Sequence, residues 1–195
     1  MMQNSVVFAG LRAVSVDGSS ASQSGPWHSD SSVGPLVGLS GEIYLSSSAS
    51  QSSWQFAGLG AGLTPFIGGI DTNPSTGAIR LITAGFPVAG TLTRDAWHNV
   101  YFVFDFTSQT YNFWLDSVQL GSRVPFCGDN GPCGGAHIAS YGSSLFDTFG
   151  GGTDFGYLDN FAVSNVPQTP EPGTLALLGV GVAGLAGMLR RRQRS

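Results

Sequence analysis

The sequence contains no lysine, and its positive charges are unevenly placed. Four of the eight arginines stand at the extreme C-terminus, as Arg190, Arg191, Arg192 and Arg194. Upstream of that tail, the other four arginines are outnumbered by eleven acidic residues. Nucleic-acid binding requires a basic patch that neutralises phosphates. No such patch can be assembled upstream of the tail, so we expect no nucleic-acid partner.

Glutamate is almost as scarce as lysine, since Glu42 is the only one upstream of the tail. Glycoside hydrolysis normally uses two carboxyl groups in defined roles, and no Glu-x-Asp-x-x-Glu string of the glucanase type occurs. Serine, histidine and aspartate are present, but the Gly-x-Ser-x-Gly elbow of serine hydrolases is not. From these absences the sequence predicts that the protein is not an enzyme.

Cysteine occurs twice, as Cys127 and Cys133 in the segment CGDNGPC. Two thiols do not complete a zinc site without further ligands. His137 follows four residues after Cys133, but the remaining partners are not evident. A local disulfide closing this loop is the better interpretation if the domain is exported. The histidines His28, His98 and His137 are not expected to bind a metal.

An apolar run, Thr174–Leu189, precedes the terminal arginines and carries no charge. As a helix it would span roughly 24 Å, and flanking arginines can extend to the interface of a hydrocarbon core of about 30 Å. Its large apolar residues surround the whole helix axis, whereas a buried helix of a soluble domain is usually amphipathic. The run therefore predicts a single-pass membrane anchor, or a transient stop-transfer signal, with the arginines on the cytoplasmic side. Its apolar residues are Leu175, Leu177, Leu178, Val180, Val182, Leu185 and Leu189.

Immediately before this run stand Pro170, Glu171 and Pro172. The order of Pro-Glu-Pro, apolar helix and arginine cluster resembles the PEP-CTERM sorting signal of Gram-negative bacterial proteins. The resemblance implies export, recognition of the Pro-Glu-Pro motif by an exosortase-type membrane enzyme, and delivery to the cell envelope or the extracellular matrix. We therefore divide the chain into a domain at 1–165 and a sorting tail at 166–195.

An exported protein should begin with a charged segment followed by an apolar one. The residues Met1–Gly18 contain only a short apolar patch and no early lysine or arginine. We therefore expect the native start to lie upstream of Met1, or this chain to be a fragment.

Upstream of the tail the pattern predicts an all-β domain, most simply a two-sheet sandwich. Trp97–Leu120 reads as a meander of three strands, because large apolar residues alternate with polar ones on either side of short turns. Further strands are expected at Leu39–Leu45, Trp54–Leu59, Ala78–Thr83 and Phe155–Val163. In the last of these, Tyr157, Asp159, Phe161 and Val163 should share one side.

The block Gly90–Gly121 resembles the Trp-His-x-Val and Tyr-x-Phe-x-Leu-Asp meander of concanavalin A-like, laminin-G-like jelly rolls, and Phe155–Val166 is similar to their closing strand. The resemblance implies a jelly roll of two antiparallel sheets that often binds glycans, sometimes with calcium. At Asp116-Ser117 the sequence departs from the usual Asp/Asn-Gly. Calcium would suit the Asp and Asn oxygens of the loops, but no ligand set is recognisable, so no metal or cofactor is assigned.

Glycan binding usually places a flat aromatic ring beneath the apolar face of a sugar. Trp114 has the opposite parity to Tyr111, Phe113 and Leu115, which predicts that it faces away from the core. Trp27, in a serine-rich loop, is the second choice. The sequence thus predicts a non-catalytic protein that binds or organises extracellular polysaccharide. The alternative is a structural or adhesive envelope protein with no dedicated ligand site.

Overall fold

The fold is known from a computed structural model of the 195-residue chain. The structure describes residues 2–3, 13–17, 27–29, 34–46, 53–61, 66–73, 75–127, 137–149 and 155–165. The chain divides into two units, Met1–Asn165 and Val166–Ser195. The second unit, with the sorting motif, the predicted helix at 174–189 and the arginine cluster, lies outside the described residues.

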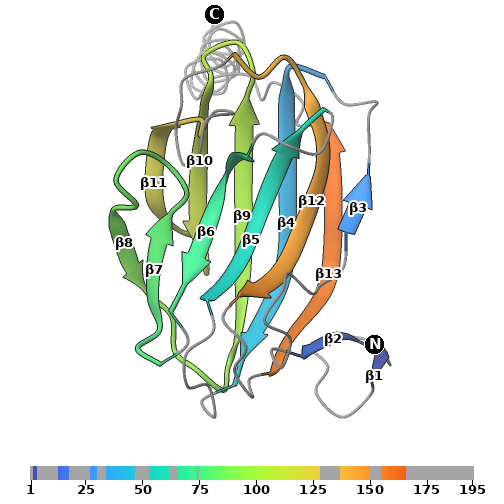
Figure 1. Ribbon diagram of the computed structural model, residues 1–195, viewed down its shortest axis with the longest axis vertical. Helices are drawn as coiled ribbons and strands as arrows, with labels where there is room; N and C mark the ends of the chain where they lie inside the picture. The colour runs from blue at the N-terminus through green and yellow to red at the C-terminus, as the bar shows by residue number, and fades with distance from the viewer. Residues whose placement is uncertain are drawn as a thin grey trace, which may run out of the picture. The chain divides into compact units, whose positions relative to one another are not determined.

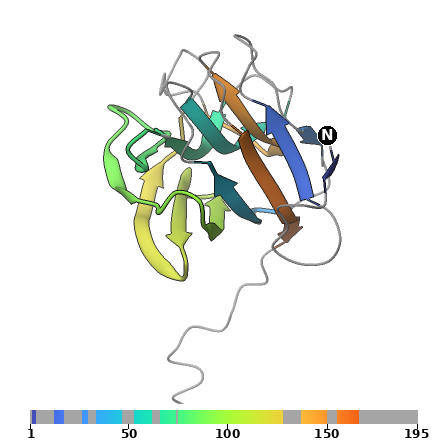
Figure 2. The same cartoon turned by 90° about the horizontal axis from the view of Figure 1, so that it is seen from below.

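The first unit is built from two antiparallel sheets, as the predicted all-β sandwich requires (Figure 1). Turned by 90°, the sheets are seen as two separate layers (Figure 2). The seven-stranded sheet has the order β1-β2-β13-β4-β9-β10-β11. Its strands are β1 (Met2–Gln3), β2 (Ala13–Asp17), β13 (Phe155–Asn165), β4 (Leu36–Leu45), β9 (Trp97–Asp105), β10 (Thr110–Leu115) and β11 (Val118–Pro125).

The six-stranded sheet has the order β3-β12-β5-β6-β7-β8 and lies nearer the viewer in Figure 1. Its strands are β3 (Trp27–Ser29), β12 (Tyr141–Phe149), β5 (Ser53–Gly60), β6 (Phe66–Thr72), β7 (Ala78–Leu81) and β8 (Val88–Thr91). Both sheets join strands that are far apart in sequence, which is the non-local pairing of a jelly roll. The predicted fold class is confirmed for the described residues.

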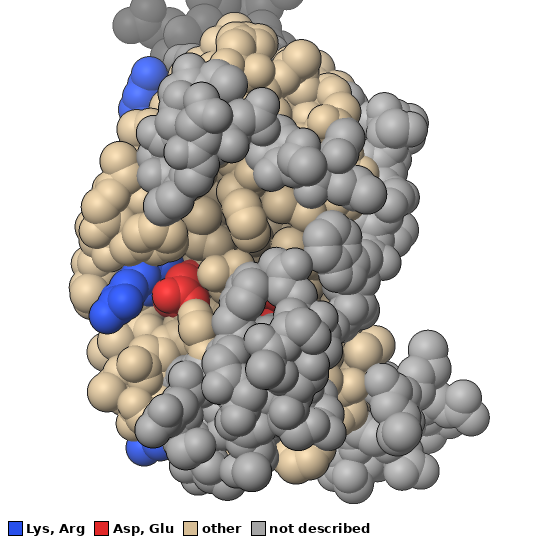
Figure 3. Space-filling view, viewed as in Figure 1, with Lys and Arg blue, Asp and Glu red and all other residues tan. Residues whose placement is uncertain are grey.

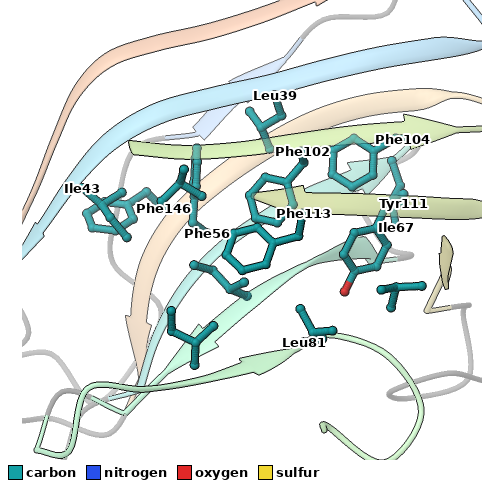
Figure 4. Close-up of a cluster of buried hydrophobic side chains, with 14 of the residues drawn as sticks. Leu39, Ile43, Phe56, Ile67, Leu81, Phe102, Phe104, Tyr111, Phe113 and Phe146 are labelled. Carbon is teal, nitrogen blue, oxygen red and sulfur yellow. The ribbon is translucent and has the colours of Figure 1, made fainter. Parts of the chain in front are cut away.

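The core lies between the sheets and is dominated by aromatic rings (Figure 4). In β9 the residues at alternate positions, including Phe102 and Phe104, are fully buried, because successive strand residues point to opposite faces. Phe102 stacks on Phe113 of β10 with ring centroids 5.0 Å apart, and it meets Phe56 of the other sheet edge-on at 5.9 Å. Burial of such rings is the main stabilising contribution that this sequence offers.

The predicted meander of β9, β10 and β11 is present, and its turns follow from local chemistry. Asp105 accepts backbone N–H bonds from Thr107 and Ser108 at 2.8 and 3.1 Å, which closes the first turn. In the second turn Asp116 and Ser117 have φ angles of 48° and 67°. A two-residue hairpin turn of type I′ has positive φ at both positions, so Ser117 adopts the conformation that glycine provides more easily.

The closing strand β13 differs from the prediction at Asn160. A register shift separates Asp159 from Ala162 in the pairing with β4, and Asn160 has a φ of 47°. This bulge reverses the alternation of side chains. As a result Phe161 and Val163 pack against the core, so the expectation that they share one side with Tyr157 and Asp159 was wrong.

Candidate functional site

The outer face of the seven-stranded sheet carries a pair of half-buried aromatic residues, Tyr101 and Trp114. They are direct cross-strand partners on β9 and β10, and their ring centroids lie 5.5 Å apart at an interplanar angle of 34°. Trp114 points away from the core, as its parity predicts, while Phe113 and Leu115 point into it. Partial burial raises the pKa of Tyr101 above its ordinary value, which keeps the phenol neutral.

A second aromatic row crosses the same face four residues away along β9. Tyr157, Tyr44 and Trp97 are register partners on β13, β4 and β9. The ring of Tyr44 lies 5.5 Å from that of Tyr157 and 5.6 Å from that of Trp97, measured between centroids. The Tyr44 hydroxyl donates to Asp95 at 3.4 Å, and burial followed by the charge of Asp95 raises its pKa. Four strand residues separate the two rows by about 13 Å.

Between the two aromatic rows runs a row of polar side chains. The Asn99 amide donates to Glu42 Oε1 at 2.8 Å, and Asp159 is the register partner of Glu42 on β13. Asn99 is exposed and Glu42 is largely buried. We call the two aromatic rows and this polar row together the aromatic face. Flat rings beside fixed hydrogen-bonding groups are the combination that holds a sugar ring.

His98 lies on β9 with its ring buried, and both of its nitrogens meet acceptors. Its Nδ1 is 2.7 Å from Asp116 Oδ2 and its Nε2 is 2.7 Å from the Thr93 carbonyl oxygen. The backbone N–H of Asn99 donates to the other oxygen of Asp116 at 2.9 Å. With both nitrogens bound, the ring has none left for a metal, so His98 joins two turns of the protein. Among the described residues no group of three or more His, Cys, Asp or Glu side chains could hold a metal ion.

The outer face of the six-stranded sheet carries a polar row of its own. Asp147 of β12 is the register partner of Gln55 on β5, Gln55 of Asp71 on β6, and Asp71 of Arg80 on β7. Acidic atoms are visible beside basic ones near the middle of this face (Figure 3). Asp147 is fully buried, and burial together with the charge of Asp71 raises its pKa to about 7. Sequence reasoning missed Asp147 because its segment was not predicted to be a strand.

The two predicted glycan-platform residues lie in different sheets. Trp114 belongs to the seven-stranded sheet, whereas Trp27 belongs to β3, which pairs with β12 in the six-stranded sheet. The structure therefore does not bring them together.

The remaining predicted site residues are tested little by the described residues. Cys127 is buried, and its backbone N–H donates to the Ile67 carbonyl oxygen at 2.9 Å. Cys133 lies outside the described residues, as do all the predicted sorting, anchor and arginine positions. Among the residues that the structure does describe, none belongs to a helix long and apolar enough to cross a membrane.

Several solved structures, all of low sequence identity, share this fold. A sialidase superposes with a TM-score of 0.57 at 11% identity over 72% of this chain and 14% of its own. A Trypanosoma rangeli sialidase gives a TM-score of 0.52 at 11% identity, covering 81% of this chain and 25% of its own. This chain thus matches a small part of either sialidase. A chain described under the endo-acting O-glycanases that human gut microbiota express to initiate mucin breakdown gives 0.54 at 10% identity, covering 80% of both chains.

These likenesses define the class of fold, a jelly-roll sandwich shared with carbohydrate-active domains. The second identification comes from the tail, where the PEP-CTERM protein-sorting motif matches residues 168–192. The protein is therefore an exported one, held by its C-terminus before processing, and the motif implies processing by an exosortase, a membrane enzyme. No curated protein matches the sequence.

The comparison also corrects the prediction that the protein is not an enzyme. Because the sandwich is shared with sialidases and with a chain of the O-glycanase group, absence of catalysis does not follow from this architecture. At this level of identity the likeness shows the fold alone and assigns no reaction. The missing Glu-x-Asp-x-x-Glu string does not exclude a pair of carboxyl groups either, since Asp147 and Asp71 reach one sheet face from different strands.

Proposed function

We propose that this exported domain interacts with extracellular polysaccharide through its aromatic face. The observation that carries the proposal is the Tyr101–Trp114 pair, two half-buried rings that face away from the core beside the polar row of Glu42 and Asn99. The apolar face of a sugar can stack on such rings while its hydroxyls bond to the neighbouring carboxylate and amide. The destination is the cell envelope or extracellular matrix of a Gram-negative bacterium.

The charge of the domain narrows the class of ligand. Acidic residues outnumber arginines upstream of the tail, and lysine is absent. A strongly acidic polysaccharide would be repelled by this net charge, whereas a neutral one would not. Neutral polysaccharide is therefore the class of ligand that the domain fits.

The test is a binding measurement with protein purified from its producing cells. The probes are the cells' own exopolysaccharide and a panel of neutral and acidic glycans, and released reducing ends are measured in the same samples. We expect saturable binding that weakens about five- to tenfold in Trp114→Ala, because stacking on one ring contributes roughly 1–1.5 kcal/mol. Trp114→Phe, which keeps a flat ring, should lose less.

Two comparisons make the result specific to this face. Phe155→Ala removes another ring that is 43% exposed, at the start of β13, and should leave binding unchanged. Trp27→Ala tests the alternative platform in the other sheet. If Trp114→Ala and Tyr101→Ala both bind as strongly as the unaltered chain, the proposed surface is wrong. Absence of binding to every probe would favour a structural or adhesive role.

A further inference from the structure

On the outer face of the six-stranded sheet, three buried carboxylate and amide oxygen atoms accept no hydrogen bond from the described residues. They are Oδ1 and Oδ2 of Asp147 and Oε1 of Gln55. Asp147 has no exposed surface at all. A buried acceptor without a donor costs free energy, and a buried carboxylate without a partner costs much more. These oxygens therefore need a hydrogen-bond donor or a cation that the described residues do not supply.

The strand register brings the three atoms together. Asp147 and Gln55 are directly opposite each other on β12 and β5, and directly opposite residues of an antiparallel pair have Cβ atoms about 5 Å apart on the same face. Asp71 is opposite Gln55 on the far side, on β6, so a second carboxylate lies one further strand away. The Ser53 hydroxyl donates to Asp71 Oδ1.

The electrostatics of this row agree with its geometry. The pKa of Asp147 is raised to about 7, first by burial and then by the charge of Asp71. Among the described residues, no positively charged side chain lowers the pKa of Asp147. Arg80, on the next strand beyond Asp71, is exposed. A single proton on Asp147 could donate to Gln55 Oε1, but it would leave the second carboxylate oxygen without a donor.

We propose that Asp147, Gln55 and Asp71 bind a divalent cation, and that calcium is the ion that fits them. All of the donors are hard oxygens, two from carboxylates and one from an amide, which is the ligand chemistry that calcium prefers. One ion contacting both oxygens of Asp147 and Oε1 of Gln55 satisfies all three acceptors at once. Asp71 supplies the second negative charge, and water completes the coordination. Magnesium fits less well because it demands strict octahedral geometry.

This site is independent of the proposed polysaccharide interaction, because the aromatic face belongs to the other sheet. All three of its residues lie within strands, in β12, β5 and β6. The ion would join three adjacent strands of the six-stranded sheet across their outer face, so its first effect would be on the stability of that sheet.

The experiment is a titration of the full chain, purified in detergent and freed of metal with a chelator. Calcium chloride and magnesium chloride are titrated separately at pH 8 by isothermal calorimetry, and thermal unfolding is recorded with and without each ion. We expect one calcium bound per chain, weaker magnesium binding, and a rise of several degrees in the melting temperature with calcium. Asp147→Asn should weaken calcium binding by about tenfold or more, because one of two charged ligands becomes neutral.

The matched control is Asp105→Asn, which neutralises an aspartate of the other sheet that closes the turn after β9. It should bind calcium like the unaltered chain. If Asp147→Asn does not fold, Gln55→Leu decides the question, since it removes the amide oxygen and leaves both carboxylates. Absence of calcium binding in the unaltered chain, or equal binding in the unaltered chain and in the folded Asp147 or Gln55 variant, would overturn the proposal.

Discussion

His98 Nδ1 lies 2.7 Å from Asp116 Oδ2, so one imidazole ring ties the turn between β10 and β11 to the residues that precede β9. The ring is buried and the Asp116 side chain is half exposed. Both are therefore fixed in one arrangement by hydrogen bonds at the end of the meander.

Removing either partner should destabilise the domain without affecting the aromatic rows. We expect His98→Ala and Asp116→Ala each to lower the free energy of unfolding by about 1–3 kcal/mol, because the hydrogen bonds of the buried imidazole are lost in both and the Asn99 N–H also loses its partner in Asp116→Ala. Asp116→Asn should cost less, since it keeps an oxygen for Asn99. Urea unfolding measures these differences. Values within about 0.5 kcal/mol of the unaltered chain for both alanine variants would show that the pair is not structural.

Close approach of the sheets at Gly68 yields a second prediction. A Cβ atom there would lie 2.3 Å from Cε1 of Tyr111, whose hydroxyl donates to the Gly69 and Ile82 carbonyl oxygens at 3.1 and 3.3 Å. The backbone fixes one end of the Tyr111 ring and the hydroxyl hydrogen bonds fix the other. Gly68→Ala should therefore destabilise the folded domain by about 1–3 kcal/mol through overpacking.

The control for Gly68 is Gly34→Ala, where the new Cβ would lie 3.4 Å from Asn165 Oδ1, close to an ordinary contact. It should unfold at nearly the same urea concentration as the unaltered chain. If Gly68→Ala proves equally harmless, the sheets are less tightly packed at Tyr111 than this geometry requires.

Asp147 should make stability depend on pH in metal-free buffer. Its pKa in the folded protein, about 7, lies above the ordinary value for aspartate, because burial raises it first and the charge of Asp71 raises it further. The stabilisation is therefore fully present below about pH 4 and is lost progressively as pH rises from there through 7, by on the order of 4 kcal/mol in total. Asp147→Asn should lack this component.

The measurement is the free energy of unfolding of both proteins between pH 4 and 8 with chelator present. Their difference isolates Asp147 from the other carboxylates. Curves that stay parallel across this range would mean that Asp147 does not titrate within it. Calcium should reduce the effect, because the bound ion offsets the charge that burial disfavours.

A substitution within the sorting motif should impair processing of the C-terminal tail. Glu171→Ala alters the Pro-Glu-Pro element within the matched residues 168–192. We expect the altered chain to keep its tail and to accumulate in the membrane fraction, as judged by the intact mass of the protein from each fraction. Gln193→Ala, just beyond the matched residues, should be processed normally. A Glu171→Ala chain of the same mature mass as the unaltered one would exclude a role for this residue.

The second half of the domain could be predicted from the sequence because its strands alternate large apolar and polar residues. The meander from Trp97 onward and the outward position of Trp114 follow from that alternation alone. The strand β12 could not be predicted, because small residues such as Gly142 and Ser143 interrupt its alternation of large apolar and polar residues. The strand β6 could not be predicted because its two adjacent glycines interrupt the alternation in the same way. In both strands tertiary pairing overrides a weak local preference.

The sites depend on pairings that alternation does not encode. Tyr44 meets Tyr157 because β13 closes the sheet beside β4, and Asp147 meets Gln55 because β12 pairs with β5. Neither register can be derived from one sequence. The bulge at Asn160 could not be predicted either, because a positive φ is uncommon for residues other than glycine and the sequence does not indicate it.

The position of β13 has a mechanical consequence. This strand lies between β2 and β4 along residues 155–158, pairs with β4 beyond them, and ends at Asn165, where the sorting tail begins. While the chain is held by its C-terminus, tension along the strand enters the sandwich through β13. Its hydrogen bonds run perpendicular to the strand, so they are sheared together and do not open one at a time. A domain joined to its anchor through an interior strand should therefore resist being pulled apart more strongly than one joined through an edge.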